Sequence, residues 1–230
     1  MFVVVVLLTA FLLTNLVSAQ AQAGAETVVD FDVFATGMVP LDFSVALTGG
    51  GDSAFWVIQE DPTAPSGKQV LTQTSTDGTA YRFPLCVYDK VTAKDVDVSV
   101  KFKPIRGKED QAAGIVWRYV DKDNYYVVRA NALENNVVLY KVEKGKRSDL
   151  KPIGASFFAY GKKVPVPDRQ WSTLRLTARG NHFAVYLNEQ HLFDVQDSTF
   201  AEAGKVGLWT KADSVTSFDD LKIESHDTND

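Results

Sequence analysis

The chain has 230 residues and a net charge of −5. Its basic residues are scattered except for two short groups beside glycines, at 144–147 and 161–163, which are typical of solvated hairpin ends, so we expect no nucleic-acid partner. Cys86 is the only cysteine, which excludes an internal disulfide.

The first residues form an apolar run closed by small residues, MFVVVVLLTAFLLTNLVSAQAQAGAE, which is the pattern of a secretory signal. Three alanines offer cleavage points, the last of them Ala23. No Lys or Arg precedes the run, so an uncleaved membrane anchor is the alternative, although Thr14 and Asn15 interrupt a run that is barely long enough to span. We therefore predict a signal peptide over 1–23, a secreted or periplasmic protein, and no stable membrane insertion after cleavage.

From residue 24 onwards, short patterns of period two alternate with Gly, Asn, Asp and Pro, and no helical period extends over ten or more residues. Such patterns predict many short β-strands joined by turns. The expected strands begin, in chain order, near residues 31, 54, 69, 95, 112, 124, 136, 172, 182, 191, 205 and 216. Turn residues between them make most successive strands antiparallel neighbours. The sequence therefore predicts one all-β domain over 24–230, a sandwich or a barrel.

The expected strand at 124–131 carries polar residues among apolar ones, and strict alternation assigns them to faces. Tyr126, Val128 and Ala130 are assigned to the core. In the neighbouring strands the same argument places Trp117 and Tyr119 in the core. The opposite sheet face is expected to carry Arg118, Tyr125, Arg129, Asn131, Trp209 and Lys211.

Two interpretations of this face remain open. It is either the solvated face of an antiparallel sheet, where such residues need no function, or a sugar site. A sugar ring packs its C–H face on an aromatic ring and offers its hydroxyls to forked donors and amides. Glu134, Asn135 and Asn136 follow in the next turn, and we interpret them as turn residues first and as ligand-binding residues second.

The chain resembles concanavalin A-like lectin and glucanase sandwiches over about 112–223, through runs such as GIVWRYV, NYYVVRAN, VGLWT and FDDL. Within that superfamily it is similar to laminin G-like and 3-keto-disaccharide hydrolase-like domains of bacterial exported proteins. The resemblance implies a two-sheet antiparallel jelly roll whose concave face binds carbohydrate in many members.

No catalytic residue can be assigned from the sequence. The E-x-D-x-x-E strand of the glucanase relatives, whose carboxylates serve as nucleophile and acid/base, does not occur. Adjacent pairs such as Asp219 and Asp220 are expected to point to opposite faces of a strand. Phosphate-loop, serine-nucleophile and zinc-protease motifs are missing as well, and His226 falls in a polar tail.

We therefore expect a carbohydrate ligand and an exported carbohydrate-binding module that uses the concave face. The alternatives are a glycoside hydrolase or lyase of the 3-keto-disaccharide hydrolase-like type, and a laminin G-like protein-interaction module.

The resemblance also implies a structural calcium site where the first and last strands meet. Such relatives use a carboxylate from the closing strand and carbonyl oxygens from the opening one, and the matching residues here are Asp220 and Asp32. Calcium takes about six to eight oxygen ligands, so several groups would have to converge. The alternative is that both aspartates are outward polar residues of their strands.

Overall fold

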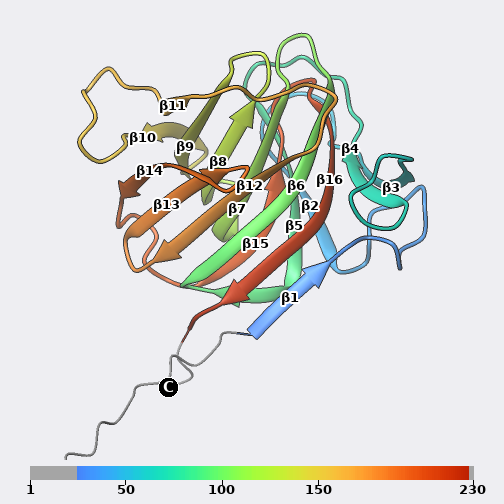
Figure 1. The fold of residues 1–230 in the computed structure, drawn as a ribbon, viewed down its shortest axis with the longest axis horizontal. Coiled ribbons are helices and arrows are strands. Elements are labelled where there is room, and N and C mark those ends of the chain that lie inside the picture. The colour runs from blue at the N-terminus through green and yellow to red at the C-terminus, as the bar shows by residue number, and fades with distance from the viewer. Residues whose placement is uncertain (1–24, 228–230) are drawn as a thin grey trace, which may run out of the picture.

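A computed structural model describes residues 25–227, which form two antiparallel β-sheets packed face to face (Figure 1). This arrangement confirms the two-sheet sandwich of jelly-roll type that the sequence predicts. The predicted signal peptide over 1–23 lies outside the described residues. The part of the chain that is described contains no helix long and apolar enough to cross a membrane.

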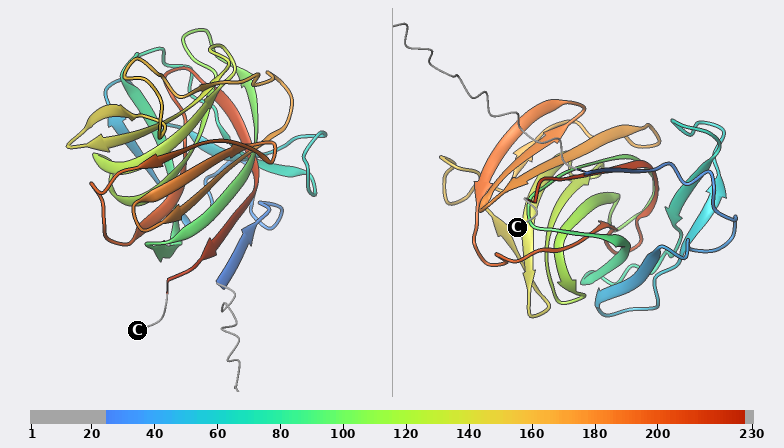
Figure 2. Two further views of the ribbon diagram at one scale, coloured as in Figure 1. Left: turned by 60° about the vertical axis from the view of Figure 1, so that its left-hand side comes forward. Right: turned by 90° about the horizontal axis from the view of Figure 1, so that it is seen from below.

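Each sheet has eight strands. Sheet A has the order β14 (Gln190–Gln196), β13 (His182–Leu187), β12 (Ser172–Arg179), β6 (Val96–Arg106), β16 (Val215–Ser225), β4 (Gln69–Gln73) and β3 (Trp56–Glu60), and β1 (Ala25–Val29) pairs with β16. Sheet B has the order β10 (Lys146–Leu150), β9 (Asn136–Glu143), β8 (Asn124–Asn131), β7 (Ala112–Asp121), β15 (Gly204–Trp209), β5 (Arg82–Ala93) and β2 (Phe43–Gly49), and β11 (Lys162–Lys163) pairs with β9. The runs β7 to β10 and β12 to β14 are meanders, whereas β15 and β16 each insert between strands distant in sequence; β1 lies beside the last part of β16 (Figure 2).

The core between the sheets is built from the inward residues that alternation predicts. Trp117 of β7 and Tyr126 of β8 are both 0% exposed and stack with ring centroids 5.1 Å apart. Phe183 of sheet A meets the Trp117 ring edge-on at 5.2 Å. Val128 and Ala130 belong to the same cluster, so the inward assignment of the β8 residues is confirmed.

The other face of sheet B is buried as well. It carries a second apolar cluster of Phe83, Leu85, Val87, Ala112, Val116, Tyr125, Val127, Val138, Tyr140, Val142 and Trp209. The guanidinium of Arg147 on β10 lies 4.5 Å from the ring of Tyr140 on β9 and 4.7 Å from the ring of Phe83 on β5. One side chain therefore contacts both β9 and β5, although β8, β7 and β15 lie between these strands in the sheet. This requires sheet B to curve strongly, so that side chains from its two sides meet over the outer face.

The structure places Arg118 away from this outer face, which corrects our assignment. The register of β7 shifts after Trp117, and Arg118 has a positive φ of 47°. A bulge adds one residue to the strand and reverses the alternation beyond it. Tyr119, expected in the core, consequently packs on the outer cluster, and Arg118 lies 5.5 Å from the ring of Phe183 in sheet A. Its guanidinium donates to the carbonyl oxygens of Lys94 at 3.0 Å, Phe200 at 2.8 Å and Gly180 at 2.5 Å.

Candidate functional site

Trp209 and Arg129 lie on the same face of sheet B, as the alternation predicts, on either side of Gly114. In the strand register, Gly114 of β7 pairs with Trp209 of β15 and with Arg129 of β8. A Cβ atom at Gly114 would come within 3.3 Å of Trp209 Cβ and 3.2 Å of Val127 Cγ2. The glycine therefore leaves the space that two large neighbouring side chains need.

Arg129 is the centre of a hydrogen-bonded group at the end of β8. Its side chain is 1% exposed, and its guanidinium donates to both carboxylate oxygens of Glu134, at 3.2 and 2.9 Å, and to Asn136 Oδ1 at 2.6 Å. The guanidinium also lies 5.6 Å from the ring of Tyr140 and 5.9 Å from that of Tyr160. This two-point contact fixes the Glu134 carboxylate at the edge of the outer face.

Asn131 and Lys211, both predicted site residues, extend this group. Asn131 Nδ2 donates to Asp110 Oδ1 and, at 3.3 Å, to Glu134 Oε1. Lys211 Nζ donates to Asp110 Oδ2. Two carboxylates, of Asp110 and Glu134, thus converge on one amide nitrogen. We call the whole set the rim site: Asp110, Arg129, Asn131, Glu134, Asn136, Tyr140, Tyr160 and Lys211.

The aromatic residues that solvent reaches on this face differ from our expectation. Trp209 and Tyr125 lie on the predicted face, but both are 0% exposed. Trp209 packs on Phe83 with centroids 5.2 Å apart, and the hydroxyl of Tyr125 hydrogen-bonds to a buried threonine. Solvent reaches Glu134, whose side chain is 37% exposed, and Tyr160, which is 43% exposed. Among the members of the rim site, the accessible aromatic ring is therefore that of Tyr160.

Sequence reasoning missed three members of the rim site. Tyr140 could have been found, because it lies two residues beyond Val138, the partner of Arg129 in the register, and therefore on the same face. Asp110 and Tyr160 lie in loops, where no period indicates a direction. Glu134 and Asn135 lie in the turn at 132–135, which confirms their interpretation as turn residues, whereas Asn136 begins β9. Glu134 and Asn136 are in addition hydrogen-bonded to Arg129.

The electrostatics of the rim site keep Arg129 and Glu134 charged and Tyr140 neutral. Burial acts to raise the pKa of Glu134, but hydrogen bonds from Arg129 and Asn136 outweigh it, so this pKa lies below the usual value. Burial acts to lower the pKa of Arg129, but Tyr140 and Glu134 outweigh it and raise that pKa. Burial also raises the pKa of Tyr140, whose hydroxyl therefore stays protonated. An ionised Glu134 accepts hydrogen bonds from hydroxyl groups and is unsuited to protonating a leaving group.

The acidic residues of the expected calcium site surround one turn, 66–69. Ser66 Oγ donates to Asp220 Oδ1 at 2.7 Å, and Ser66 N donates to Asp219 Oδ2 at 3.2 Å. Asp32 Oδ1 accepts the backbone N–H groups of Lys68 and Gln69, at 2.8 and 3.0 Å. Asp219 and Asp220 thus face the same turn, which corrects our expectation of opposite faces: β16 shifts register after Asp219, and Asp220 has a φ of 47°.

Asp219 provides a test of whether these residues fit a cation. It is 0% exposed, and burial raises its pKa to about 6. Asp220 pairs with Lys101 at 2.7 Å, whereas no ion pair to Asp219 occurs within residues 25–227. Ser66 and the backbone N–H of Asp220 donate to the Asp219 carboxylate, but no basic side chain of the described residues neutralises it, and a buried carboxylate without a cationic partner is costly. The charge and oxygen atoms of Asp219 therefore suit a cation, whereas Asp220 is already neutralised by Lys101 and Asp32 is held by backbone N–H groups.

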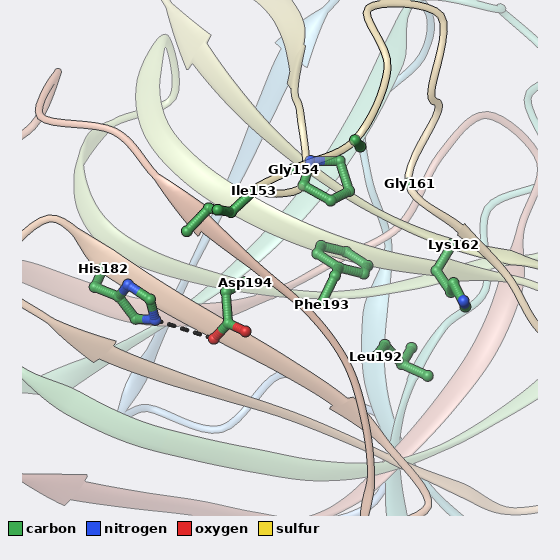
Figure 3. Close-up of a pocket in the computed structure, with 10 residues that line it drawn as sticks. Ile153, Gly154, Gly161, Lys162, His182, Leu192, Phe193 and Asp194 are labelled. Carbon is green, nitrogen blue, oxygen red and sulfur yellow. Dashed lines mark hydrogen bonds and ion pairs between the residues drawn. The ribbon is translucent and has the colours of Figure 1, made fainter.

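A separate hollow lies between the loop that follows β10 and the edge strand β14 (Figure 3). Ile153, Gly154 and Gly161 line it from the loop, and His182 and Asp194 line it from β13 and β14. His182 Nε2 lies 3.0 Å from Asp194 Oδ1, the contact drawn as a dashed line in Figure 3. The same loop therefore contributes Tyr160 to the rim site and Gly161 to this hollow, which we call the second hollow.

Comparisons with known proteins agree with this fold. The family model described as the 3-keto-alpha-glucoside-1,2-lyase-like domain matches residues 44–224. No curated protein sequence matches the chain. Among solved structures, the carbohydrate-binding module CBM66 from Bacillus subtilis is similar, with a TM-score of 0.61, 19% identity, and coverage of 84% of this chain and 99% of that one. The cellulose-induced protein Cip1 has a TM-score of 0.63 and 14% identity, with coverage of 86% and 97%. At these identities the likeness shows a shared fold.

Proposed function

Because the chain belongs to the 3-keto-alpha-glucoside-1,2-lyase-like domain family, we propose that it is an exported carbohydrate-binding module that takes its ligand at the rim site, on the concave outer face of sheet B. The observation that carries this proposal is the fixed set of polar groups around Glu134. The Arg129 guanidinium and the Asn136 amide hold the Glu134 carboxylate in one orientation, with its outer part in solvent.

The chemistry of this set suits a sugar. Sugar hydroxyls both donate and accept, so a site for them needs oriented acceptors beside oriented donors. Glu134 supplies the acceptor, and Lys211, whose Nζ gives one of its three N–H groups to Asp110, supplies donors. Tyr160 offers a partly exposed ring for a C–H face. Within the described residues, the buried Arg129 Nε has no hydrogen-bond partner. It is available as one more donor if a ligand displaces the side chains that cover it.

The similar solved structures support the same proposal at the level of fold. CBM66 is described as a carbohydrate-binding module, and this chain covers nearly all of it. We extend that property to this chain because the rim site offers the groups that sugar binding requires, and we propose secretion because the first residues have the pattern of a signal peptide.

Lyase activity is a second candidate function, favoured by one observation. Asp110 and Glu134 both hydrogen-bond to Nδ2 of Asn131, so two carboxylates meet at the rim site. Each of them is engaged by a cation, Asp110 by Lys211 and Glu134 by Arg129. The lowered pKa of Glu134 makes this carboxylate a weak base and keeps it ionised, so this arrangement favours binding over proton transfer.

We also propose that the turn at 66–69 and the aspartates around it hold a structural calcium ion. The buried Asp219 carboxylate supports this proposal, with Asp220 and Asp32 as neighbouring oxygen groups. Calcium would neutralise Asp219 and join the turn to the closing strand.

Binding and lyase activity can be tested together on the full chain. A glycan array first identifies a ligand, and calorimetry then measures its affinity for the parent, for Glu134→Gln and for His182→Gln, which alters the second hollow instead. We expect Glu134→Gln to bind about tenfold or more weakly, since hydrogen bonds to a charged group contribute about 1.5 to 3 kcal/mol. His182→Gln should bind like the parent.

The opposite pattern, with affinity lost in His182→Gln and kept in Glu134→Gln, would move the ligand to the second hollow and refute the rim site. A 3-keto-α-glucoside incubated with the parent separates the two functions. Release of the aglycone alcohol together with a 3-keto sugar that carries a C1=C2 double bond, abolished in Glu134→Gln, would establish the lyase. Intact substrate with measurable binding would establish the module.

A further inference from the structure

Three metal-ligating side chains meet at the end of β16, on sheet A and apart from the rim site. Asp97 lies on β6, Glu224 lies on β16, and His226 follows the end of β16. One potential ligand atom from each lies within 4.8 Å of the other two, and this is the only such cluster among residues 25–227. His226 Nε2 is 3.6 Å from Asp97 Oδ2 and 3.6 Å from Glu224 Oε1.

Hydrogen bonds of the backbone hold these three residues in place. Asp97 and Glu224 are direct partners in the antiparallel register of β6 and β16. His226 N donates to Asp95 O at 2.8 Å, and both oxygens of the Asp227 carboxylate accept backbone N–H groups of the turn before β6. The cluster is therefore built before any ligand arrives, and binding would not have to order it.

The cluster lacks the partners that its polar atoms need. Two carboxylates directly opposite each other on neighbouring strands repel. Asp97 also contacts Arg179 at 3.2 Å, but within the described residues the only ion-pair contact of Glu224 is with His226. His226 Nε2 and Asp97 Oδ1 are buried atoms with no hydrogen-bond partner in the same part of the chain. Leaving such atoms unpaired costs about 1 to 3 kcal/mol each.

A metal ion would remove this cost. The two 3.6 Å separations are too long for hydrogen bonds. They are close to the spacing of atoms that share one ion: with bonds of about 2.0 to 2.2 Å in a tetrahedral arrangement, ligand atoms lie roughly 3.3 to 3.6 Å apart. One imidazole with two carboxylates is a donor set of mixed nitrogen and oxygen that first-row divalent cations accept, whereas calcium prefers oxygen alone.

We propose that Asp97, Glu224 and His226 form a binding site for a divalent transition-metal cation, with Zn²⁺ as the expected ion. The groove beside it, which Ser99, Arg175 and Lys222 line together with Asp97 and Glu224, leaves room for water at the remaining position. An ion bound here would link the end of β16 to β6. This site is independent of the rim site and of the proposed calcium.

Calorimetry with zinc chloride tests the proposal on the full chain, prepared without a histidine tag and freed of metal with EDTA. The variants are His226→Gln and, as a matched control, His191→Gln, whose imidazole contacts Asp194 at 3.0 Å on β14. We expect one equivalent of Zn²⁺ in the parent and in His191→Gln, and an affinity about tenfold or more lower in His226→Gln. An excess of Ca²⁺ should leave the Zn²⁺ titration unchanged.

A thermal melt of each variant without metal confirms that it is folded, and a second ligand variant, Asp97→Asn, should repeat the loss of affinity. The proposal is overturned if the parent binds no Zn²⁺ or if His226→Gln binds it as the parent does. Loss of binding in His191→Gln with binding kept in His226→Gln would overturn it too, because it would assign the ion to the His182, Asp194 and His191 edge.

Discussion

Truncation of Trp117 to alanine tests the packing between the two sheets. Trp117 is 0% exposed and lies between Tyr126, at 5.1 Å, and Phe183 of the opposite sheet, at 5.2 Å. Its Nε1 has no hydrogen-bond partner within the described residues, so the variant breaks no hydrogen bond there and loses only packing. Truncating a buried tryptophan costs about 3 to 5 kcal/mol. Because two aromatic contacts each add about 0.5 to 1.5 kcal/mol, we expect the upper half of that range.

The loss should be visible as a shift of the melting temperature. In a domain of this size each kcal/mol lowers Tm by about 2 to 4 °C, so about 4 to 5 kcal/mol corresponds to roughly 8 to 20 °C. Trp171→Ala is the matched control, because the Trp171 ring is partly exposed and has Lys103 Nζ 5.0 Å from its centroid. Urea and thermal unfolding of both variants measure the effect. Equal Tm values for the two variants would refute the inward assignment of Trp117.

Three further predictions concern charged groups. Burial acts to raise the pKa of Asp61, but hydrogen bonds from Lys103 and its neighbours hold it below the usual value. The stability that this depressed pKa provides is present above the pKa of about 4 in the unfolded chain and is lost as pH falls through the pKa in the folded chain. If urea midpoints are measured from pH 6 to 2.5, the midpoint of Asp61→Asn should therefore fall less steeply with decreasing pH than that of the parent. Arg118→Met should lower the free energy of unfolding by about 2 to 4 kcal/mol, because it leaves the partly buried carbonyl oxygens of Phe200 and Gly180 without their donor. Arg175→Met, on the surface of sheet A, should change that free energy by under about 1 kcal/mol, and equal losses would contradict the structural role of Arg118. Saturating Ca²⁺, at about a hundredfold over its Kd, should add about 2.7 kcal/mol to the free energy of unfolding of the parent and less to that of Asp220→Asn. An unchanged melting temperature, with no metal found by elemental analysis, would leave this aspartate a surface residue.

The faces of the central strands could be predicted from the sequence because side chains of a strand alternate without exception while the register holds. Tyr126 in the core and Arg129 with Trp209 on the other face follow from this rule alone. The prediction failed at Arg118, where one added residue reverses the alternation. It failed again at Asp219 and Asp220 for the same reason. No composition signal marks either position, since a bulge depends on how two strands twist against each other.

The burial of the outer face could not be predicted, because it depends on residues distant in sequence. Alternation places Trp209 correctly, yet its exposure is decided by Phe83 and by the curvature that brings Arg147 across the sheet. A flat sheet with the same sequence pattern would leave Trp209 in solvent. The same curvature brings Tyr160, in an irregular loop, to Arg129.

The inner face of sheet B packs on sheet A and its outer face carries an apolar cluster, so the proposed ligand would meet polar groups only where they follow that cluster. That place is the end of β8, where Arg129, Asn131 and Glu134 follow Val127 along one face. The buried Arg129 charge needs Glu134 as its partner, since an unpaired charge at that depth would cost several kcal/mol. The same ion pair that stabilises the fold therefore orients the acceptor that the proposed sugar ligand would meet, so the energetics of the sheet maintain the geometry that our proposal requires.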